Sequence, residues 1–238
     1  MNDHPQRIVL LLPKLSFGRR LKFTFVSLAI VFTATVSSAA QTAENLTASS
    51  TETQGIEKGW NEFGIWGGIS FHSPTWIGQT PDVRFGNIGL RYGRVLAASK
   101  SVAFEYTIDA VPVAILSTRD SVICPLIQRC PPFRVRESVY GAGLSPIGLK
   151  FNFRRQRRFQ PFAAATGGFL YFQRDVPFSG AAQFNYTFDF AGGIQIVNSN
   201  RRSFTIGYKY QHISNGDRSP INPGVDVQMV YVGYSIFK

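Results

Sequence analysis

An alternation of large apolar side chains with small or polar ones runs through most of this chain and constrains its fold more than any other feature. In one such run, Phe204, Ile206 and Tyr208 alternate with Thr205 and Gly207. Because successive side chains of a strand point to opposite faces, a period of two predicts strands with one apolar face. The expected strands cover residues 61–72, 85–96, 101–115, 138–153, 159–173, 183–197, 203–214 and 225–237.

The two faces of these runs differ in a way that favours a membrane protein. Bulky apolar groups gather on one face, whereas the other holds Gly, Ala and isolated charges such as Glu105 and Asp109. A barrel with a lipid-covered outside and a narrow interior distributes side chains in this way. A soluble lipocalin-like barrel, with Glu105 and Asp109 outside, is the structural alternative. The scarcity of charge on the apolar faces favours an all-β, eight-stranded antiparallel transmembrane β-barrel.

The connections between the expected strands alternate between short and long. Outer-membrane barrels have short periplasmic turns and longer extracellular loops, so the alternation predicts that all long connections lie at the outer end. The short connections are expected at residues 97–100, 154–158 and 198–202, and the longer ones at 73–84, 116–137, 174–182 and 215–224.

The N-terminal segment has the pattern of an export signal. Basic residues precede an apolar run that ends in small residues, with Ser38 and Ala40 fitting the small-x-small cleavage rule. The apolar run has about 14 residues, fewer than the roughly 20 that a spanning helix needs. We therefore expect a secretory signal peptide over residues 1–40, a flexible leader over 41–58 and a barrel over 59–238, in the bacterial outer membrane.

Charge and cysteine content narrow the partners. The net charge of +11 suits a polyanionic surface, although basic turns such as 154–158 are a simpler explanation for part of it. Nucleic acid is disfavoured as a partner because export separates the chain from it. Cys124 and Cys130 are expected to form a disulfide in an oxidising compartment. Two thiolates alone make a poor metal site, and we expect neither a metal nor a cofactor.

Three residues near the last two strands have the chemistry of an esterase. His212 and Ser214 are two apart on one strand and therefore share a face, where a nucleophile and its base can meet. They lie on the apolar face, where polar side chains are costly without a function. A hairpin would bring Asp226 near His212, as an acid that orients imidazole. An interfacial histidine without catalytic function is the alternative, and His72 is a rival base.

The same region resembles a known family. The likeness lies in His212-x-Ser214-Asn215, in Asn222-Pro223-Gly224, in the acidic residue at 226, in the closing strand from Tyr231 to Tyr234, and in Gly141-x-Gly143-Leu144-Ser145-Pro146-Ile147-Gly148-Leu149. These motifs resemble those of the lipid A 3-O-deacylases of the PagL type and the related outer-membrane acyloxyacyl hydrolases.

The resemblance implies an eight-stranded barrel that hydrolyses the ester-linked acyl chain at the 3-position of lipid A, with lipopolysaccharide of the outer leaflet as its partner. It assigns Ser214 as nucleophile, His212 as base and Asp226 as the orienting acid. Asn222 corresponds to the family's oxyanion-stabilising asparagine, with Asn215 or Gly224 as helpers. The family often has Glu in place of Asp226, and the side chain here is one methylene shorter.

Two other functions remain open from the sequence. One is a non-catalytic small barrel with a structural or adhesive role, and the other is a lipid A acyltransferase with an interior acyl pocket. The sequence also leaves homodimerisation open.

Overall fold

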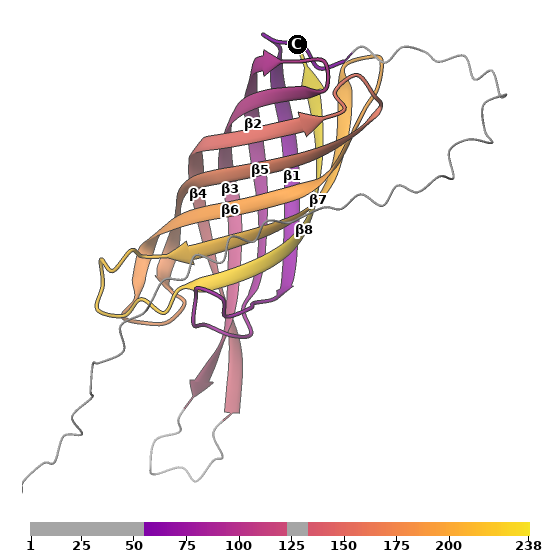
Figure 1. The fold of residues 1–238 in the computed structure, drawn as a ribbon. Helices are drawn as coiled ribbons and strands as arrows, with labels where there is room; N and C mark the ends of the chain where they lie inside the picture. The colour runs from indigo at the N-terminus through magenta and orange to yellow at the C-terminus, as the bar shows by residue number, and fades with distance from the viewer. Residues whose placement is uncertain (1–54, 123–132) are drawn as a thin grey trace, which may run out of the picture. The chain divides into compact units, whose positions relative to one another are not determined.

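The computed structural model describes residues 55–122 and 133–238, which form a closed antiparallel barrel in which each strand pairs with its sequence neighbours and β8 pairs with β1 (Figure 1). The expected signal peptide, most of the expected leader and the Cys124–Cys130 pair lie outside the described residues. No helix among the described residues is long and apolar enough to span a membrane. The strands are β1 (Asn61–His72), β2 (Arg84–Ala98), β3 (Val102–Val122), β4 (Phe133–Phe153), β5 (Phe159–Val176), β6 (Ala182–Val197), β7 (Arg202–Ser214) and β8 (Val225–Phe237).

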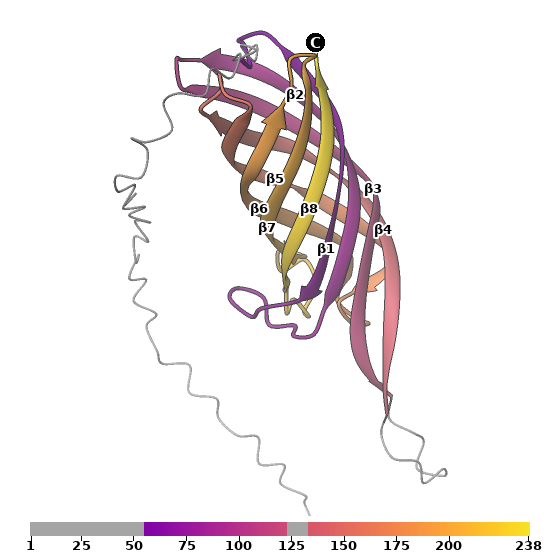
Figure 2. The ribbon, with the colours of Figure 1, turned by 90° about the vertical axis from the view of Figure 1, so that its right-hand side faces the viewer.

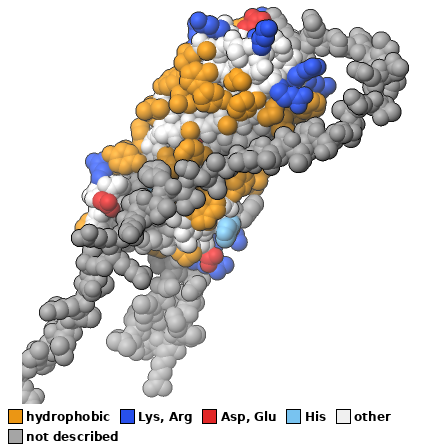
Figure 3. Space-filling model, in the orientation of Figure 1, with side chains coloured by type: hydrophobic (Ala, Val, Ile, Leu, Met, Phe, Trp, Pro, Cys, Tyr) orange, Lys and Arg blue, Asp and Glu red, His pale blue; other side chains and the backbone are white. Residues whose placement is uncertain are grey.

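The outer surface of the barrel is apolar, as expected for a wall covered by lipid. Phe63, Ile65 and Tyr208 are among many large hydrophobic side chains that are about half exposed. On the face drawn in Figure 3, hydrophobic side chains cover the middle of the barrel and Lys and Arg gather toward its two ends. Glu105 and Asp109 are buried inside. This arrangement confirms the transmembrane barrel and excludes the lipocalin-like alternative, in which these carboxylates would lie outside.

Opposite charges in the interior of the barrel lie in contact with one another. Lys150 Nζ lies 2.9 Å from Glu62 Oε2 and 3.3 Å from Glu105 Oε2. The guanidinium of Arg91 donates two hydrogen bonds, of 2.8 and 2.7 Å, to the Asp109 carboxylate. Paired charges of this kind lower the cost of removing them from water, so the interior accepts them.

The interior is bulkier than the sequence predicts. Besides small and polar groups it contains aromatic side chains, including Phe162 and Tyr231. Glycine makes room for them: a Cβ atom on Gly207 would lie 2.6 Å from Tyr231 Cε1 and 3.0 Å from Phe162 Cζ. The alternating pattern does not reveal this close approach because it depends on which strands face each other across the lumen.

Three strands continue beyond the expected bounds by three or more residues. β3 was expected to end at residue 115 and β4 to begin at 138, but they stay paired through Ser117↔Ser138 and Arg119↔Arg136. The neighbouring strands stop earlier, so the two form a hairpin that extends past the barrel end in Figures 1 and 2. β5 also extends to Val176, and the connections expected at 116–137 and 174–182 are correspondingly shorter. The two strands of a hairpin can satisfy their inner backbone groups without help from the barrel.

The alternation of connections separates the two ends of the barrel. The connections 73–83, 177–181 and 215–224 lie at the same end as the extended hairpin, and the turns 99–101, 154–158 and 198–201 lie at the other end with the C-terminus (Figures 1 and 2). The end of β7 and the start of β8 therefore lie at the end with the longer loops, which in outer-membrane barrels faces outward.

Candidate active site

A buried histidine–aspartate pair connects the last two strands. The register of β7 and β8 places His212 directly opposite Asp226. Their side chains are in contact, with His212 Nδ1 2.6 Å from Asp226 Oδ1. Only 7% of His212 and none of Asp226 is exposed. With a carboxylate at Nδ1, the neutral ring carries its proton there, which leaves Nε2 as a base.

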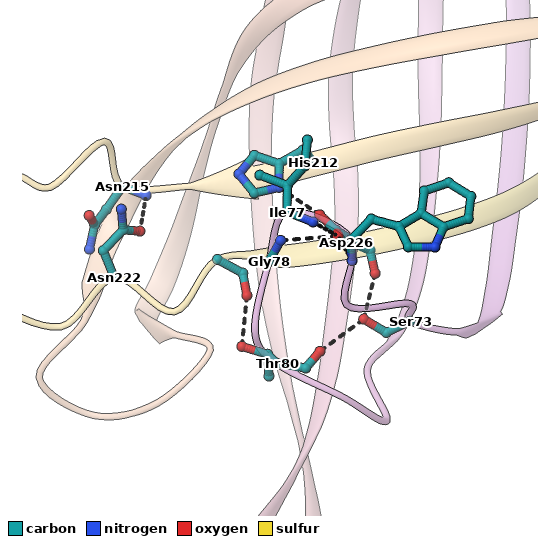
Figure 4. Close-up of polar contacts among 10 residues, drawn as sticks. Ser73, Ile77, Gly78, Thr80, His212, Asn215, Asn222 and Asp226 are labelled. Atoms are coloured by element: carbon teal, nitrogen blue, oxygen red, sulfur yellow. Dashed lines mark hydrogen bonds and ion pairs between the residues drawn. The ribbon is translucent and has the colours of Figure 1, made fainter. Parts of the chain in front are cut away.

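The loop between β1 and β2 holds the other oxygen of the same carboxylate. The backbone N–H groups of Trp76, Ile77 and Gly78 donate to Asp226 Oδ2 over 2.8, 2.7 and 3.0 Å (Figure 4). Successive backbone donors that converge on one oxygen form an anion-binding nest. Asp226 is therefore fixed in orientation and held as the charged form. Despite lacking one methylene relative to Glu, it reaches both the histidine and the nest.

Further hydrogen bonds attach this loop to β8. Ser73 Oγ lies 2.5 Å from the backbone oxygen of Asp226 and 3.0 Å from that of Thr80. Thr80 Oγ1 donates to the Gly224 backbone oxygen over 2.8 Å. Sequence reasoning missed this loop because its contribution comes from backbone N–H groups, which every residue except proline has. Gly78 is the one local signal, since a Cβ there would lie 2.9 Å from the backbone of Gly224.

Aromatic side chains surround the histidine on the outer wall. The Phe188 ring lies 5.1 Å from the imidazole, centroid to centroid. Trp76 stacks on Tyr210 at 5.3 Å, and Tyr210 is two residues before His212 on the same face of β7. Trp76 itself is 68% exposed and Ile77 is also exposed. The histidine–aspartate pair is therefore bordered by side chains of the apolar wall.

Ser214 is the last residue of β7 and lies opposite Tyr186 of β6. It is partly exposed and shares the face of His212. Two residues along a strand are separated by about 6.7 Å, so the two side chains are neighbours. No hydrogen bond joins the Ser214 hydroxyl to His212 in the described part of the chain. The contact between hydroxyl and imidazole in unliganded esterase sites is often long and tightens with substrate.

The two asparagines of the motif stabilise the loop between β7 and β8. The Asn215 backbone N–H donates to Asn222 Oδ1 over 3.1 Å, and Asn215 Nδ2 donates to the Ile221 backbone oxygen over 2.8 Å. Asn222 Nδ2 donates to Asp217 Oδ1 over 2.9 Å. An amide nitrogen carries two protons, so Asn222 keeps one N–H for a ligand. Figure 4 shows both asparagines to one side of the histidine–aspartate pair.

His72, the rival base, ends β1 with an exposed side chain and lies opposite Gln228. The structure records no acid in contact with it among residues 55–122 and 133–238. Within these same ranges, no group of three or more His, Cys, Asp or Glu side chains could hold a metal ion.

Substituting Gly224 by alanine is expected to lower the activity of this site by about tenfold without unfolding the barrel. Gly224 has a φ of +63°, which costs a residue with a side chain about 1 kcal/mol. The new Cβ would lie 3.1 Å from His212 Cε1, so the imidazole must shift. Gly180→Ala is the matched control, because Gly180 also has positive φ but its Cβ would approach only Ile221. Equal activity of the two variants would contradict the prediction.

Comparison with known proteins agrees with this architecture. Residues 86–235 match the family model for lipid A 3-O-deacylase (PagL). The structure of the outer membrane enzyme PagL is similar with a TM-score of 0.54 and 12% identity, covering 71% of this chain and 97% of that one. Neisserial surface protein A has a TM-score of 0.43 and 11% identity, covering 75% of this chain and 99% of that one. None of the curated proteins compared matches the sequence.

At 12% identity, the similarity to the PagL structure extends to the fold alone. The family match is of a different kind, because it covers most of the barrel, from β2 to β8, including the histidine–aspartate pair. The resemblance seen in the sequence motifs is thereby confirmed, and the chain belongs to the lipid A 3-O-deacylase (PagL) family.

Proposed function

We propose that this protein is an outer-membrane esterase that removes the ester-linked acyl chain at the 3-position of lipid A by a Ser-His-Asp mechanism. The observation that carries the proposal is the His212–Asp226 pair, buried beneath a loop on the apolar wall at the end with the longer loops. Lipid esters of the outer leaflet would lie at that level of the wall. Membership of the lipid A 3-O-deacylase family supports this substrate and the outer-membrane location.

In the first half-reaction, Ser214 Oγ attacks the carbonyl carbon of the ester while His212 Nε2 takes the hydroxyl proton. Asp226 stabilises the imidazolium that forms and keeps the proton of the neutral ring on Nδ1, which leaves Nε2 as the base. Collapse of the tetrahedral intermediate breaks the bond to the sugar oxygen, and the imidazolium returns the proton to that oxygen. The acyl group remains on Ser214.

In the second half-reaction, water attacks the acyl-serine and His212 again accepts the proton. The fatty acid leaves when the serine oxygen takes that proton back. The free N–H of Asn222 is the proposed donor to the oxyanion in both steps, with Asn215 and Gly224 supporting it. One such donor typically contributes about 3 kcal/mol to an acyl transfer. The steps use only protein groups and water.

The apolar surroundings of the pair suit a lipid substrate. Trp76, Ile77 and Phe188 present exposed or half-exposed apolar surface next to His212, where an acyl chain can lie along the wall. The proposal also includes an export signal over residues 1–40, a leader over 41–58 and a disulfide between Cys124 and Cys130. These three features are predictions from the sequence.

Mass spectrometry of lipid A from cells that express the protein tests the proposal. Cells with the wild type are expected to lose one hydroxyacyl group from lipid A, whereas cells with Ser214→Ala retain it, because the nucleophile is gone. Ser219→Ala is the control, since it removes a hydroxyl from the loop that follows Ser214, and this hydroxyl donates to the Gly180 backbone oxygen. A heavier lipid A would instead indicate acyl transfer, and unchanged lipid A in all strains would favour a structural barrel.

A further inference from the structure

Three arginines form a basic cluster on the outer face of β2, β3 and β4, separate from the histidine–aspartate pair. Arg119 on β3 lies directly opposite Arg136 on β4, and Arg84 on β2 lies opposite Ser117, two residues before Arg119. Side chains directly opposite have Cβ atoms about 5 Å apart, and diagonal ones about 7–8 Å. The three guanidinium groups can therefore approach a single ligand.

Neighbouring side chains compensate only part of the positive charge of this cluster. Like charges directly opposite each other destabilise a sheet. In addition to partial burial, repulsion from Arg84 and Arg119 lowers the pKa of Arg136. Of the described side chains, only the carboxylate of Asp82 pairs with the cluster, 3.4 Å from Arg119 Nη1, and both partners are about half exposed. Three cations with one anion leave an excess of positive charge.

One of the guanidinium groups is already held in position. Arg136 Nη1 donates to the Ser117 backbone oxygen over 2.9 Å, and Nη2 donates to the Asp82 backbone oxygen over 3.1 Å. Arginine presents five N–H donors, so Arg136 keeps others for an oxyanion. A positioned guanidinium loses less conformational freedom when it binds phosphate.

The cluster stands at the border of the apolar wall. On the same outward face, Ile115 lies opposite Tyr140, with exposed fractions of 46% and 41%. Ser117 is two residues further along β3 and Arg119 four, and each step of two residues rises about 6.7 Å. Lipid tails cover the apolar row, so the arginines lie at the level of the headgroups.

We propose that Arg84, Arg119 and Arg136 bind a phosphate group of a glycolipid in the leaflet around the barrel. The inference goes beyond the proposed function, since this site and His212 contact the leaflet at different places on the wall. Arginine binds phosphate through paired, charge-assisted hydrogen bonds. Around the wall, β2, β3 and β4 are each at least three strand spacings from β7, or about 14 Å. The arginines therefore contact a glycolipid at a place on the wall that is separate from His212.

The loop between β1 and β2 connects the two sites. Its residues 76–78 bind the Asp226 carboxylate, and Asp82 near its end contacts Arg119 and Arg136. A phosphate that competes with Asp82 for Arg119 therefore acts on the loop that holds the Asp226 carboxylate.

Binding of lipid A to the purified protein in detergent micelles tests this site. The inactive Ser214→Ala protein is titrated with phosphorylated lipid A and with the same lipid after enzymatic removal of its phosphates. Adding Arg84→Gln and Arg119→Gln is expected to weaken binding of the phosphorylated lipid about tenfold, with little effect on the dephosphorylated lipid. The matched control is Arg157→Gln with Arg202→Gln, two exposed arginines at the other end of the barrel.

The outcomes separate the two proposals. Equal weakening for both lipids, or none for either, overturns the phosphate site. If hydrolysis by the protein with an intact Ser214 nevertheless occurs, the proposed function stands without it. If no lipid A is hydrolysed but the arginine-dependent preference for phosphorylated lipid remains, the phosphate site stands and the esterase proposal fails.

Discussion

Replacing His212 by alanine is expected to slow lipid A deacylation by about 10⁴- to 10⁶-fold, because nucleophile and base act as a unit and neither works without the other. The ring is buried and its one side-chain hydrogen bond among the described residues is to Asp226, so the barrel should still assemble. The measurement is the single-turnover rate of acyl release from lipid A in mixed micelles. Rate, rather than endpoint, is needed because slow residual hydrolysis can consume substrate over hours.

Asp226→Asn tests the other member of the histidine–aspartate pair. The amide preserves size but offers an N–H where the carboxylate accepts hydrogen bonds from His212 and from the loop N–H groups. An amide in place of the orienting acid favours the wrong tautomer of imidazole, and losses on the order of 10⁴-fold follow in related triads. Asp189→Asn is the control. It makes the same chemical change in a carboxylate that contacts Lys209 inside the barrel. A His212→Ala protein with near wild-type activity would refute the assignment of the base.

Replacing Lys150 by methionine is expected to lower the free energy of unfolding by about 3–5 kcal/mol, the effect of breaking a buried ion pair from one side. Lys150 is the cation between Glu62 and Glu105, and all three side chains are almost fully buried. Without it, two carboxylates face each other in a narrow interior. Urea unfolding of the protein in detergent micelles, followed by tryptophan fluorescence, measures the change.

A second variant also removes the two carboxylates that Lys150→Met leaves without a cation. Lys150→Met combined with Glu62→Gln and Glu105→Gln leaves no ionised group at the cluster and should recover much of the lost stability. If the single Lys150→Met variant unfolds at the same urea concentration as the wild type, the cluster does not stabilise the barrel. Lys150, Glu62 and Glu105 lie toward the end of the barrel with the turns 99–101 and 154–158, whereas the candidate active site lies at the opposite end. The folded fraction of the variant should therefore keep its activity.

The strands were predictable because lipid on one side and a packed interior on the other impose a period of two. The runs of β1, β7 and β8 agree with the structure to within one residue. The hairpin of β3 and β4 was underestimated because, past the apolar wall, Ser117 and Arg119 no longer alternate in polarity as Phe204 and Thr205 do.

The sequence by itself determined the barrel, the outward face of His212, Ser214 and Asp226, and the family motifs around them, because each depends on local period or spacing. Only the tertiary structure decided what surrounds those residues. The loop 73–83 binds the Asp226 carboxylate through its backbone N–H groups. The arginines of β2, β3 and β4 lie together because of the register of these strands. Backbone donors carry no side-chain signature, and register joins residues far apart in the chain.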